Sequence, residues 1–250
     1  MNLFIGSEAN LKAGDTPLRI AQQTDYPWQG RVKMSVDPDR PVDLTLAVRI
    51  PGWSHGSAMP SDLYRFADDA PGRLKAAPTK STKSPPSGVG AGLPGPSRGA
   101  GSRPGSFVGA GLPGPSRGAG SRPALTVNGK PVPLTLDRGY ARIARRWQKG
   151  DVVELDLPMP VRRVLAHDGV AENRGKAAIE RGPIVYAVEA IDNGGSLKDL
   201  RVPLDAALGQ ELRKNLLGGV VVVTGQGVVA VPYFAWANRG KSEMAVWLPR

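Results

Sequence analysis

The stretch Val42–Ile50, "VDLTLAVRI", alternates between two kinds of side chain. Every second residue is a large aliphatic one, and most of those between are polar or small; the aliphatic series is Val42, Leu44, Leu46, Val48 and Ile50. Successive side chains of a β-strand point to opposite faces, so a period of two indicates a strand with one buried face. The stretch therefore predicts a half-buried strand in a layered β-sheet.

The sequence on both sides continues this pattern. "RVKMSV" (31–36) and "GDVVELDLPM" (150–159) alternate in the same way, and "DPDRP" (37–41) supplies a turn. Asn128-Gly129 predicts a tight hairpin, because both positions accept positive φ. Further strands are predicted in "GPIVYAV" (182–188), "GVVVVT" (219–224), "GVVAVPYFAW" (227–236) and "EMAVWL" (243–248).

Many short strands separated by turns are typical of antiparallel sandwiches. We predict an all-β fold with two antiparallel β-sandwich (jelly-roll-like) domains, the first in residues 1–160 and the second, smaller one in residues 161–250. A single helix is predicted at 205–215, "DAALGQELRKN", where Asp205 is suited to an N-cap and two glycines follow the end.

Residues 76–123 interrupt the first predicted sandwich. The sixteen residues Val89–Pro104, "VGAGLPGPSRGAGSRP", recur unchanged at Val108–Pro123, and glycine and proline fill half of positions 84–123. Such a composition buries too little apolar surface to offset its ordering entropy, so we predict a disordered insert that joins two strands of one sandwich. Identical copies without a core pattern indicate a recent duplication rather than a solenoid.

The net charge of +11 belongs mainly to the same region. Eight basic and no acidic residues lie between Arg73 and Pro123, and the rest of the chain holds 25 basic and 22 acidic residues. Spaced arginines could contact phosphates, but Phe107 is the one aromatic residue in the insert, so base stacking has little support. A nucleic-acid-binding protein is therefore the lowest-ranked alternative.

Composition also limits the chemistry that this chain can perform, and it leaves the redox compartment undecided. The chain has no cysteine, which excludes disulfides, thiolate ligands and a cysteine nucleophile within it. No apolar run is long enough to span a bilayer, and the first residues lack the features of a signal peptide. We expect no membrane association, and the localisation stays undecided, with the cytoplasm as the default.

The polar residues give no catalytic or metal-binding set. Glu154 and Asp156 lie two apart, which places both on the solvent face of one strand. Glu180 and Glu189 flank "RGPIVYAV", where Glu189 is suited to end a buried strand or to bind an arginine. The two histidines, His55 and His167, have no partners at a metal-ligand spacing. We therefore predict no catalytic residue and no metal ligand.

Aromatic residues beside turns are the better candidates. Their flat faces can stack on sugar rings, and they can equally fill a core or pack against another domain. The prediction favours packing between domains or in a core, with sugar contact as the open alternative, for Tyr26, Trp28, Trp53, Trp147 and Trp236. Tyr233 and Trp247 lie in similar positions.

Taken together, seven stretches resemble one family in order and character. They are "QTDYPWQGRVKMSV" (23–36), "LAVRIPGWS" (46–54), "LTVNGKPV" (125–132), "GYARIARRWQKGDVVELDLPMPVRRV" (139–164), "ERGPIVYAVEAIDN" (180–193), "LLGGVVVV" (216–223) and "VPYFAWANRGKSEMAVWLP" (231–249). The chain resembles the C-terminal β-sandwich region of glycoside hydrolase family 127, the β-L-arabinofuranosidase-like enzymes. The opening "NLFIGSEANL" is similar to the segment just after the catalytic domain, which suggests a gene fragment.

The resemblance implies that catalysis lies elsewhere. In the family, an N-terminal (α/α)6 barrel carries a cysteine nucleophile and a zinc ion held by cysteines and a glutamate. No residue here can inherit those roles, so the resemblance implies no cofactor in this chain and no activity for the chain alone. The expected partner is the barrel, in the same chain or as a separate polypeptide, and arabinose-containing plant-type glycans are expected substrates. The alternative is a freestanding carbohydrate-binding module.

Overall fold

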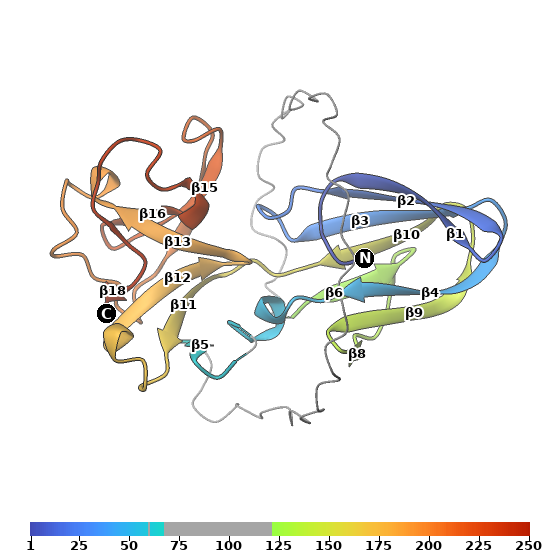
Figure 1. Ribbon diagram of the computed structural model, residues 1–250, viewed down its shortest axis with the longest axis horizontal. Helices are drawn as coiled ribbons and strands as arrows, with labels where there is room; N and C mark the ends of the chain where they lie inside the picture. Colours follow the sequence, from blue (N-terminus) through green and yellow to red (C-terminus); the bar gives the residue numbers. More distant parts are fainter. Residues whose placement is uncertain (60, 68–121) are drawn as a thin grey trace, which may run out of the picture.

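The computed structural model describes residues 1–59, 61–67 and 122–250, and its sheets are antiparallel throughout these residues. Figure 1 shows two lobes side by side, joined by a narrow connection, with the N-terminus in one lobe and the C-terminus in the other. The predicted all-β, antiparallel fold is confirmed. The predicted disorder of the insert falls mostly outside the described residues.

The lobe that holds the N-terminus, called here the first half, is a two-sheet sandwich. Six strands in the order β1-β2-β3-β10-β6-β7 form one sheet, and three in the order β4-β9-β8 form the other. Its strands are β1 (Ser7–Ala13), β2 (Thr16–Thr24), β3 (Arg31–Pro38), β4 (Val42–Arg49), β6 (Ala124–Val127), β7 (Lys130–Pro131), β8 (Leu136–Asp137), β9 (Tyr140–Trp147) and β10 (Asp151–Asp156).

The core of the first half lies between these sheets. The alternation in the sequence places Val32, Met34 and Val36 of β3 opposite Leu46 and Val48 of β4, and all five are buried. Burying each such side chain stabilises the fold by about 1.5–3 kcal/mol.

The predicted hairpin closes one end of the six-stranded sheet. Asn128 and Gly129 have φ of 51° and 75°, as the tight turn requires. The Asn128 amide donates to Asp151 Oδ1 over 2.7 Å, and its oxygen accepts from Val152 N over 2.8 Å. The turn thus ties β6 to β10.

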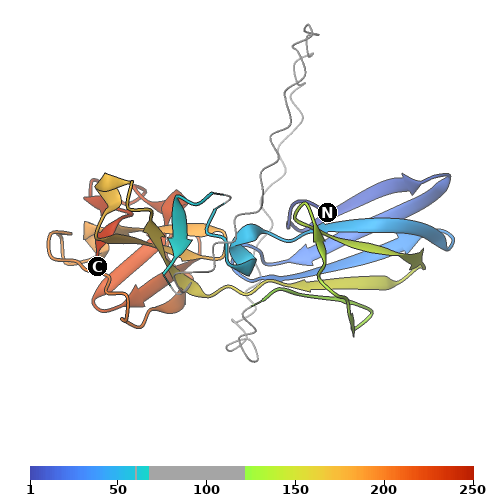
Figure 2. The ribbon, with the colours of Figure 1, turned by 90° about the horizontal axis from the view of Figure 1, so that it is seen from below.

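The other lobe, the second half, is built on a single curled sheet of nine strands. The main path runs β14-β15-β16-β13-β12-β11-β5, and β17 and β18 pair with β13 and β12. The strands are β5 (Tyr64–Phe66), β11 (Val161–Ala166), β12 (Lys176–Arg181), β13 (Ile184–Glu189), β14 (Gly209–Arg213), β15 (Val220–Gly225), β16 (Val228–Pro232), β17 (Met244–Ala245) and β18 (Leu248–Pro249). Figure 2 shows this lobe from a second side, and its strands enclose a core that includes Ile179, Tyr186 and Val223.

The helices of the described residues are four short 3-10 turns. They are η1 (Gly52–His55), η2 (Ala171–Asn173), η3 (Ala190–Asp192) and η4 (Tyr233–Ala235). In the parts of the chain that the structure describes, no helix has the length and apolar character needed to cross a bilayer.

The helix predicted at 205–215 is wrong. Gly209–Arg213 form β14, which pairs with β15 from Gly209↔Thr224 to Arg213↔Val220. Helix propensity is a weak local preference. Here it is overridden because the valine-rich β15 otherwise presents an open sheet edge, and β14 covers that edge.

The prediction that the insert joins two strands of one sandwich is also wrong. The last strand before residues 68–121 is β5, which pairs with β11 in the second half (Phe66↔Val164). The first strand after them is β6, which pairs with β10 in the first half. The chain therefore contributes β5 to the second half, then β6–β10 to the first half, and passes to the second half again between β10 and β11. The predicted domain boundary at 160/161 lies in this last connection.

Candidate functional site at the junction of the two halves

The two halves meet where β10 passes into β11. The loop of residues 25–30 lies directly on this connection, and Leu157 N donates to Gly30 O over 3.0 Å. A Cβ added to Gly30 would lie 1.7 Å from the Leu157 carbonyl oxygen, so no side chain fits there. On the other side, a Cβ at Gly182, where φ is +57°, would lie 2.2 Å from Met159 Sδ. These close approaches fix the path of the connection.

Two arginines of the second half bind backbone carbonyls of two tryptophans in the first half. Arg162 Nη1 of β11 donates to Trp53 O over 3.1 Å, and Arg181 Nη2 at the end of β12 donates to Trp28 O over 3.0 Å. Arg181 is buried, and its Nε also donates to Gln210 Oε1 of β14. Hydrogen bonds from a charged donor are stronger than those between neutral groups. The pair therefore holds the halves in one arrangement.

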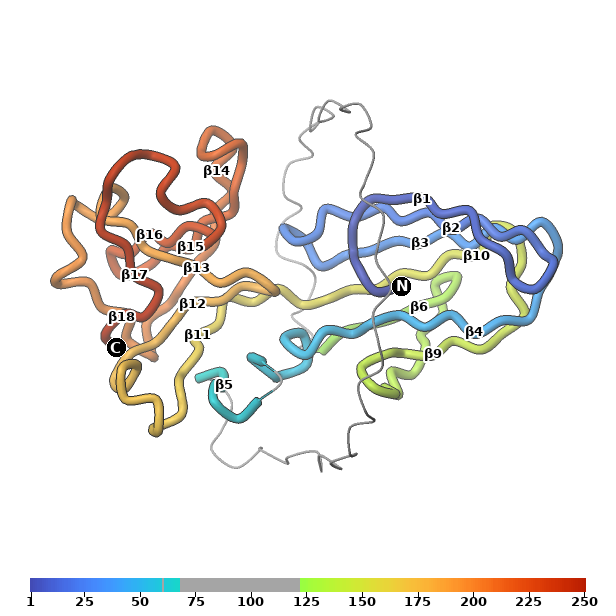
Figure 3. Tube along the Cα trace, in the orientation of Figure 1, coloured from blue at the N-terminus to red at the C-terminus, as the bar shows by residue number. Residues whose placement is uncertain are grey.

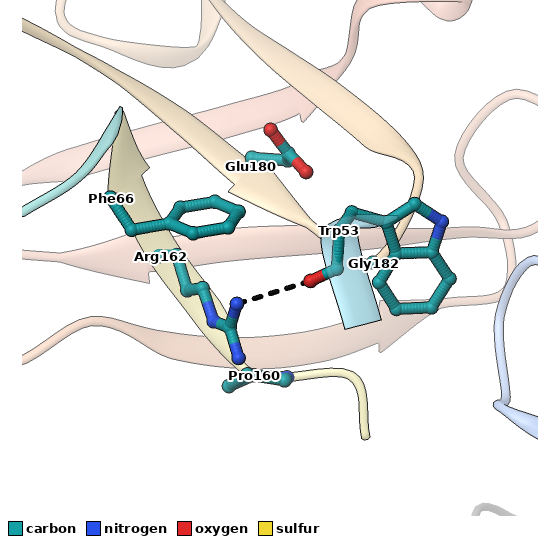
Figure 4. A pocket seen from close by; sticks show the side chains of 6 residues that line it. All are labelled: Trp53, Phe66, Pro160, Arg162, Glu180 and Gly182. Atoms are coloured by element: carbon teal, nitrogen blue, oxygen red, sulfur yellow. Dashed lines mark hydrogen bonds between the residues drawn. The ribbon is translucent and has the colours of Figure 1, made fainter. Parts of the chain in front are cut away.

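Arg162 lies at the centre of a small cluster, shown in Figure 4. Its guanidinium carbon lies 4.5 Å from the centroid of the Phe66 ring, a cation–π contact. Glu180 faces Arg162 across the β11–β12 pairing and is buried. Burial raises the pKa of Glu180 to about 7, and the charge of Arg162 opposes this rise.

A shallow depression within this cluster is lined by Trp53, Phe66, Pro160, Arg162, Glu180 and Gly182. The side chains pack so closely that a water molecule does not fit inside it. The junction is therefore a packed contact between two halves.

The structure brings two of the predicted aromatic residues to the junction. Trp53 supplies the carbonyl that Arg162 binds, and its ring lies beside Gly182. Trp28 packs against the core of the second half and lies 6.1 Å from the Phe234 ring, centroid to centroid.

The other predicted aromatic residues each pack within one half. Trp147 is fully buried in the first core, and its Nε1 donates to Leu44 O over 3.1 Å. Tyr26, in the loop of residues 25–30, packs edge-on against Phe4 at 5.5 Å and hydrogen-bonds with the Trp53 side chain. Trp236 lies 6.3 Å from Tyr233 on the surface of the second half. A sugar-contacting role for any of the five stays a prediction.

The polar candidates from the sequence lie apart from one another. Glu154 and Asp156 are exposed on β10, whereas Glu189 is buried at the end of β13. Glu189 Oε2 accepts from Arg239 Nη2 over 2.6 Å, and the same nitrogen lies 2.5 Å from Asp192 Oδ2. This ion pair holds the loop that carries η4.

Neither histidine is part of a ligand cluster. His55 and His167 are both exposed. Within residues 1–59, 61–67 and 122–250, no group of three or more His, Cys, Asp or Glu side chains could hold a metal ion.

The sequence analysis did not find Arg162, Arg181 or Phe66. Their partners lie far away in the chain: 109 residues separate Arg162 from Trp53, and 153 separate Arg181 from Trp28. One signal was available. Glu180 and Arg181 follow the apolar run Ala177–Ile179 in one strand, without the alternation that marks a solvent face, and buried charged residues need partners.

Two family models match this chain. The model described as "Beta-L-arabinofuranosidase, GH127 middle domain" matches residues 1–63 and 115–159. The model described as "Glycoside hydrolase family 127 C-terminal domain" matches residues 161–249. The two matches meet at the connection between β10 and β11. The chain belongs to glycoside hydrolase family 127, and its two halves match the family's middle and C-terminal domains.

Similar proteins are about three times longer. The non-reducing end β-L-arabinofuranosidase of Bifidobacterium longum subsp. longum is 34% identical over 99% of this chain and 32% of its own length. A solved family 127 β-L-arabinofuranosidase from Geobacillus stearothermophilus T6 is 31% identical, with a TM-score of 0.69, over 99% of this chain and 33% of that one. A second solved family 127 β-arabinofuranosidase is 28% identical, with a TM-score of 0.73, over 99% of this chain and 34% of that one. The chain thus spans about a third of the relatives that it matches.

Proposed function

We propose that this chain is the non-catalytic, bracing part of a family 127 enzyme that hydrolyses β-L-arabinofuranosides. The remaining two thirds of such an enzyme would supply the catalytic (α/α)6 barrel, in the same polypeptide or as a separate one. Arabinose-containing plant-type glycans are the proposed substrates of the complete enzyme. The match to about a third of each relative supports this division of roles.

The observation that carries the proposal is the junction. Arg162 and Arg181 hold the two halves together through the Trp53 and Trp28 carbonyls, and the cluster around Arg162 has no room for a sugar. Ligand sites are open concave pockets of several hundred Å³. A filled, hydrogen-bonded contact is suited to support rather than to catalysis.

The zinc ion that the family resemblance implies does not fit the residues of this chain that the structure describes. Zinc sites need several converging nitrogen, sulfur or carboxylate ligands. The chain has no cysteine, and the described residues hold no suitable group of three. We therefore assign the metal and the nucleophile to the barrel.

The test is an activity assay on the purified chain with a chromogenic β-L-arabinofuranoside. We expect no turnover and no stoichiometric zinc. Turnover that follows the protein through successive columns would overturn the proposal.

A titration with arabinose oligosaccharides, followed by tryptophan fluorescence, tests the alternative of a binding module. We expect no saturable response. Saturable binding that Trp53→Ala abolishes and Trp236→Ala leaves intact would favour the binding module instead.

A further inference from the structure

A small polar cavity lies in the second half, where β5, the end of β11 and the start of β12 come together. It has a volume of about 40 Å³. A single water molecule needs about 10–15 Å³, so a charged group of a few atoms fits inside. Figure 3 shows the C-terminus beside the loop that joins β11 to β12, on the side of this lobe away from the first half. The cavity is therefore separate from the junction.

Positive charge dominates the lining of this cavity. One acidic residue, Asp168, lines it together with four basic ones, which are Arg65, Arg174, Lys176 and Arg250. His167 also lines the cavity, and its Nδ1 accepts from Gly169 N over 3.0 Å. A neutral ring with this hydrogen bond carries its proton on Nε2, so the histidine offers a further donor.

The basic side chains around the cavity lack ionic partners. Within the residues that the structure describes, no ion pair or side-chain hydrogen bond involves the side chains of Arg65, Lys176 or Arg250. Arg174 Nη2 donates to the backbone carbonyl of Asp168 over 3.0 Å, which leaves its charge without a carboxylate. By contrast, Arg239 binds two carboxylates in the same half.

The gathered charges repel one another. Arg65 and Lys176 are half-buried, and water screens such charges less than it screens fully exposed ones. An anion inside the cavity would offset the repulsion and would accept hydrogen bonds from donors that have no protein acceptor. The empty lining is therefore suited to a negatively charged ligand.

We propose that this cavity, called here the basic cavity, binds an oxyanion group such as a carboxylate or a phosphate. Arginine and lysine are the donors that proteins use for these groups. The group is either the carboxylate of an acidic sugar or a free inorganic ion, and both offer several oxygen acceptors. The volume admits the charged group alone, so the rest of an acidic glycan would lie outside. The inference goes beyond the function proposed above and does not depend on it.

The experiment titrates the isotope-labelled chain with inorganic phosphate, glucuronate or glucose at constant ionic strength and follows the backbone amide signals by NMR. We expect saturable shifts at Asp168 and Gly175 with phosphate or glucuronate, and no shift with uncharged glucose. Arg65→Gln/Lys176→Gln removes two charged donors and should weaken binding by at least about tenfold. The matched control Arg31→Gln/Lys33→Gln removes the same charges from exposed positions of β3 and should bind as the wild type does.

The two sources of the oxyanion give different results. Glucuronate binding at least as tight as that of phosphate assigns the basic cavity to an acidic sugar, and tighter phosphate binding assigns it to a free ion. Unchanged amide signals of the first half show that the variants fold, and Lys176→Gln alone serves if the double variant does not.

Three results would overturn the inference. They are the absence of saturable shifts with both anions, equal binding by the wild type and the cavity variant, and glucose shifts as large as those of glucuronate. Hydrolysis by the chain alone would overturn the proposed function and leave the anion titration standing, so the two failures are distinguishable.

Discussion

The two halves bury their strands in different ways. In the first half, β3 buries every second side chain (Val32, Met34 and Val36), as expected for a sheet with one face in a core. In the second half, β15 buries four in succession, Val220–Val223. Val223 lies in the core of the curled sheet, while Val220 and Val222 pack outside it with Trp28 from the first half. The sandwich closes its core from its own strands, whereas the second half uses a side chain of its neighbour as cover.

The largest expected effect tests whether the second half depends on the first. Trp147→Ala removes a fully buried side chain from the first core and should lower the free energy of unfolding by about 3–5 kcal/mol. If the second half relies on its neighbour, both halves should unfold in one earlier transition. Denaturant unfolding followed by circular dichroism measures this, with Leu204→Ala as an exposed control. A second-half transition that stays at the wild-type midpoint would contradict the dependence.

The next-largest effect on stability concerns the contact that Arg181 makes between the two halves. Arg181→Met keeps an unbranched apolar stem but removes the guanidinium, which leaves the Trp28 carbonyl and the Gln210 oxygen without their donor. We expect a loss of about 2–3 kcal/mol and a broader transition, because the halves become less coupled. Calorimetry measures both. Arg146→Met on the exposed side of β9 is the matched control and should change stability by less than about 0.5 kcal/mol.

A pH effect is expected at Glu180. Burial raises its pKa to about 7 from 4.5, so the folded protein binds a proton here that the unfolded chain releases. The stability of the wild type should therefore fall as the pH rises from about 4.5 to 7. Glu180→Gln removes this fall and should be more stable than the wild type at pH 8 by on the order of 2 kcal/mol.

At pH 4, below the unfolded pKa of 4.5, the difference between the Glu180→Gln variant and the wild type should nearly vanish. Thermal midpoints measured between pH 4 and 8 test this, and Glu154→Gln on the exposed face of β10 is the control. A pH profile of Glu180→Gln identical to that of the wild type would show that Glu180 is not the group responsible.

The smallest effect concerns the repeat. Residues 68–121, which the structure does not describe, make up most of the segment between β5 and β6. Deleting one period of the repeat, residues 89–107, shortens this undescribed part from roughly 54 to 35 residues. Closing a shorter loop costs less entropy, so the free energy of unfolding should rise by about 0.4 kcal/mol. Loss of Arg98 and Arg103 should also shorten retention on heparin. A fall in stability of several kcal/mol would show that the segment packs on one of the halves.

Local patterns predicted most of the strands, and contacts distant in sequence explain the failures. The strand in Val42–Ile50 and the turn at Asn128-Gly129 could be predicted from the sequence, since strand period and turn conformation are set by neighbouring residues. The helix predicted at 205–215 failed because β15, beyond the segment, determines its conformation. The junction could not be predicted for the same reason: nothing near Arg181 in the sequence indicates that it binds Trp28.

The placement of β5 has a consequence for the integrity of the molecule after cleavage. A protease cut in the connection at residues 158–160 would divide the chain into two fragments. The N-terminal fragment would still supply β5 to the sheet of the C-terminal one, through the pairing of Tyr64–Phe66 with Val164–Ala166, and Trp28 to its outer face. The two pieces would thus remain a complementing pair, because the N-terminal fragment holds a strand and a covering side chain that the C-terminal fragment lacks.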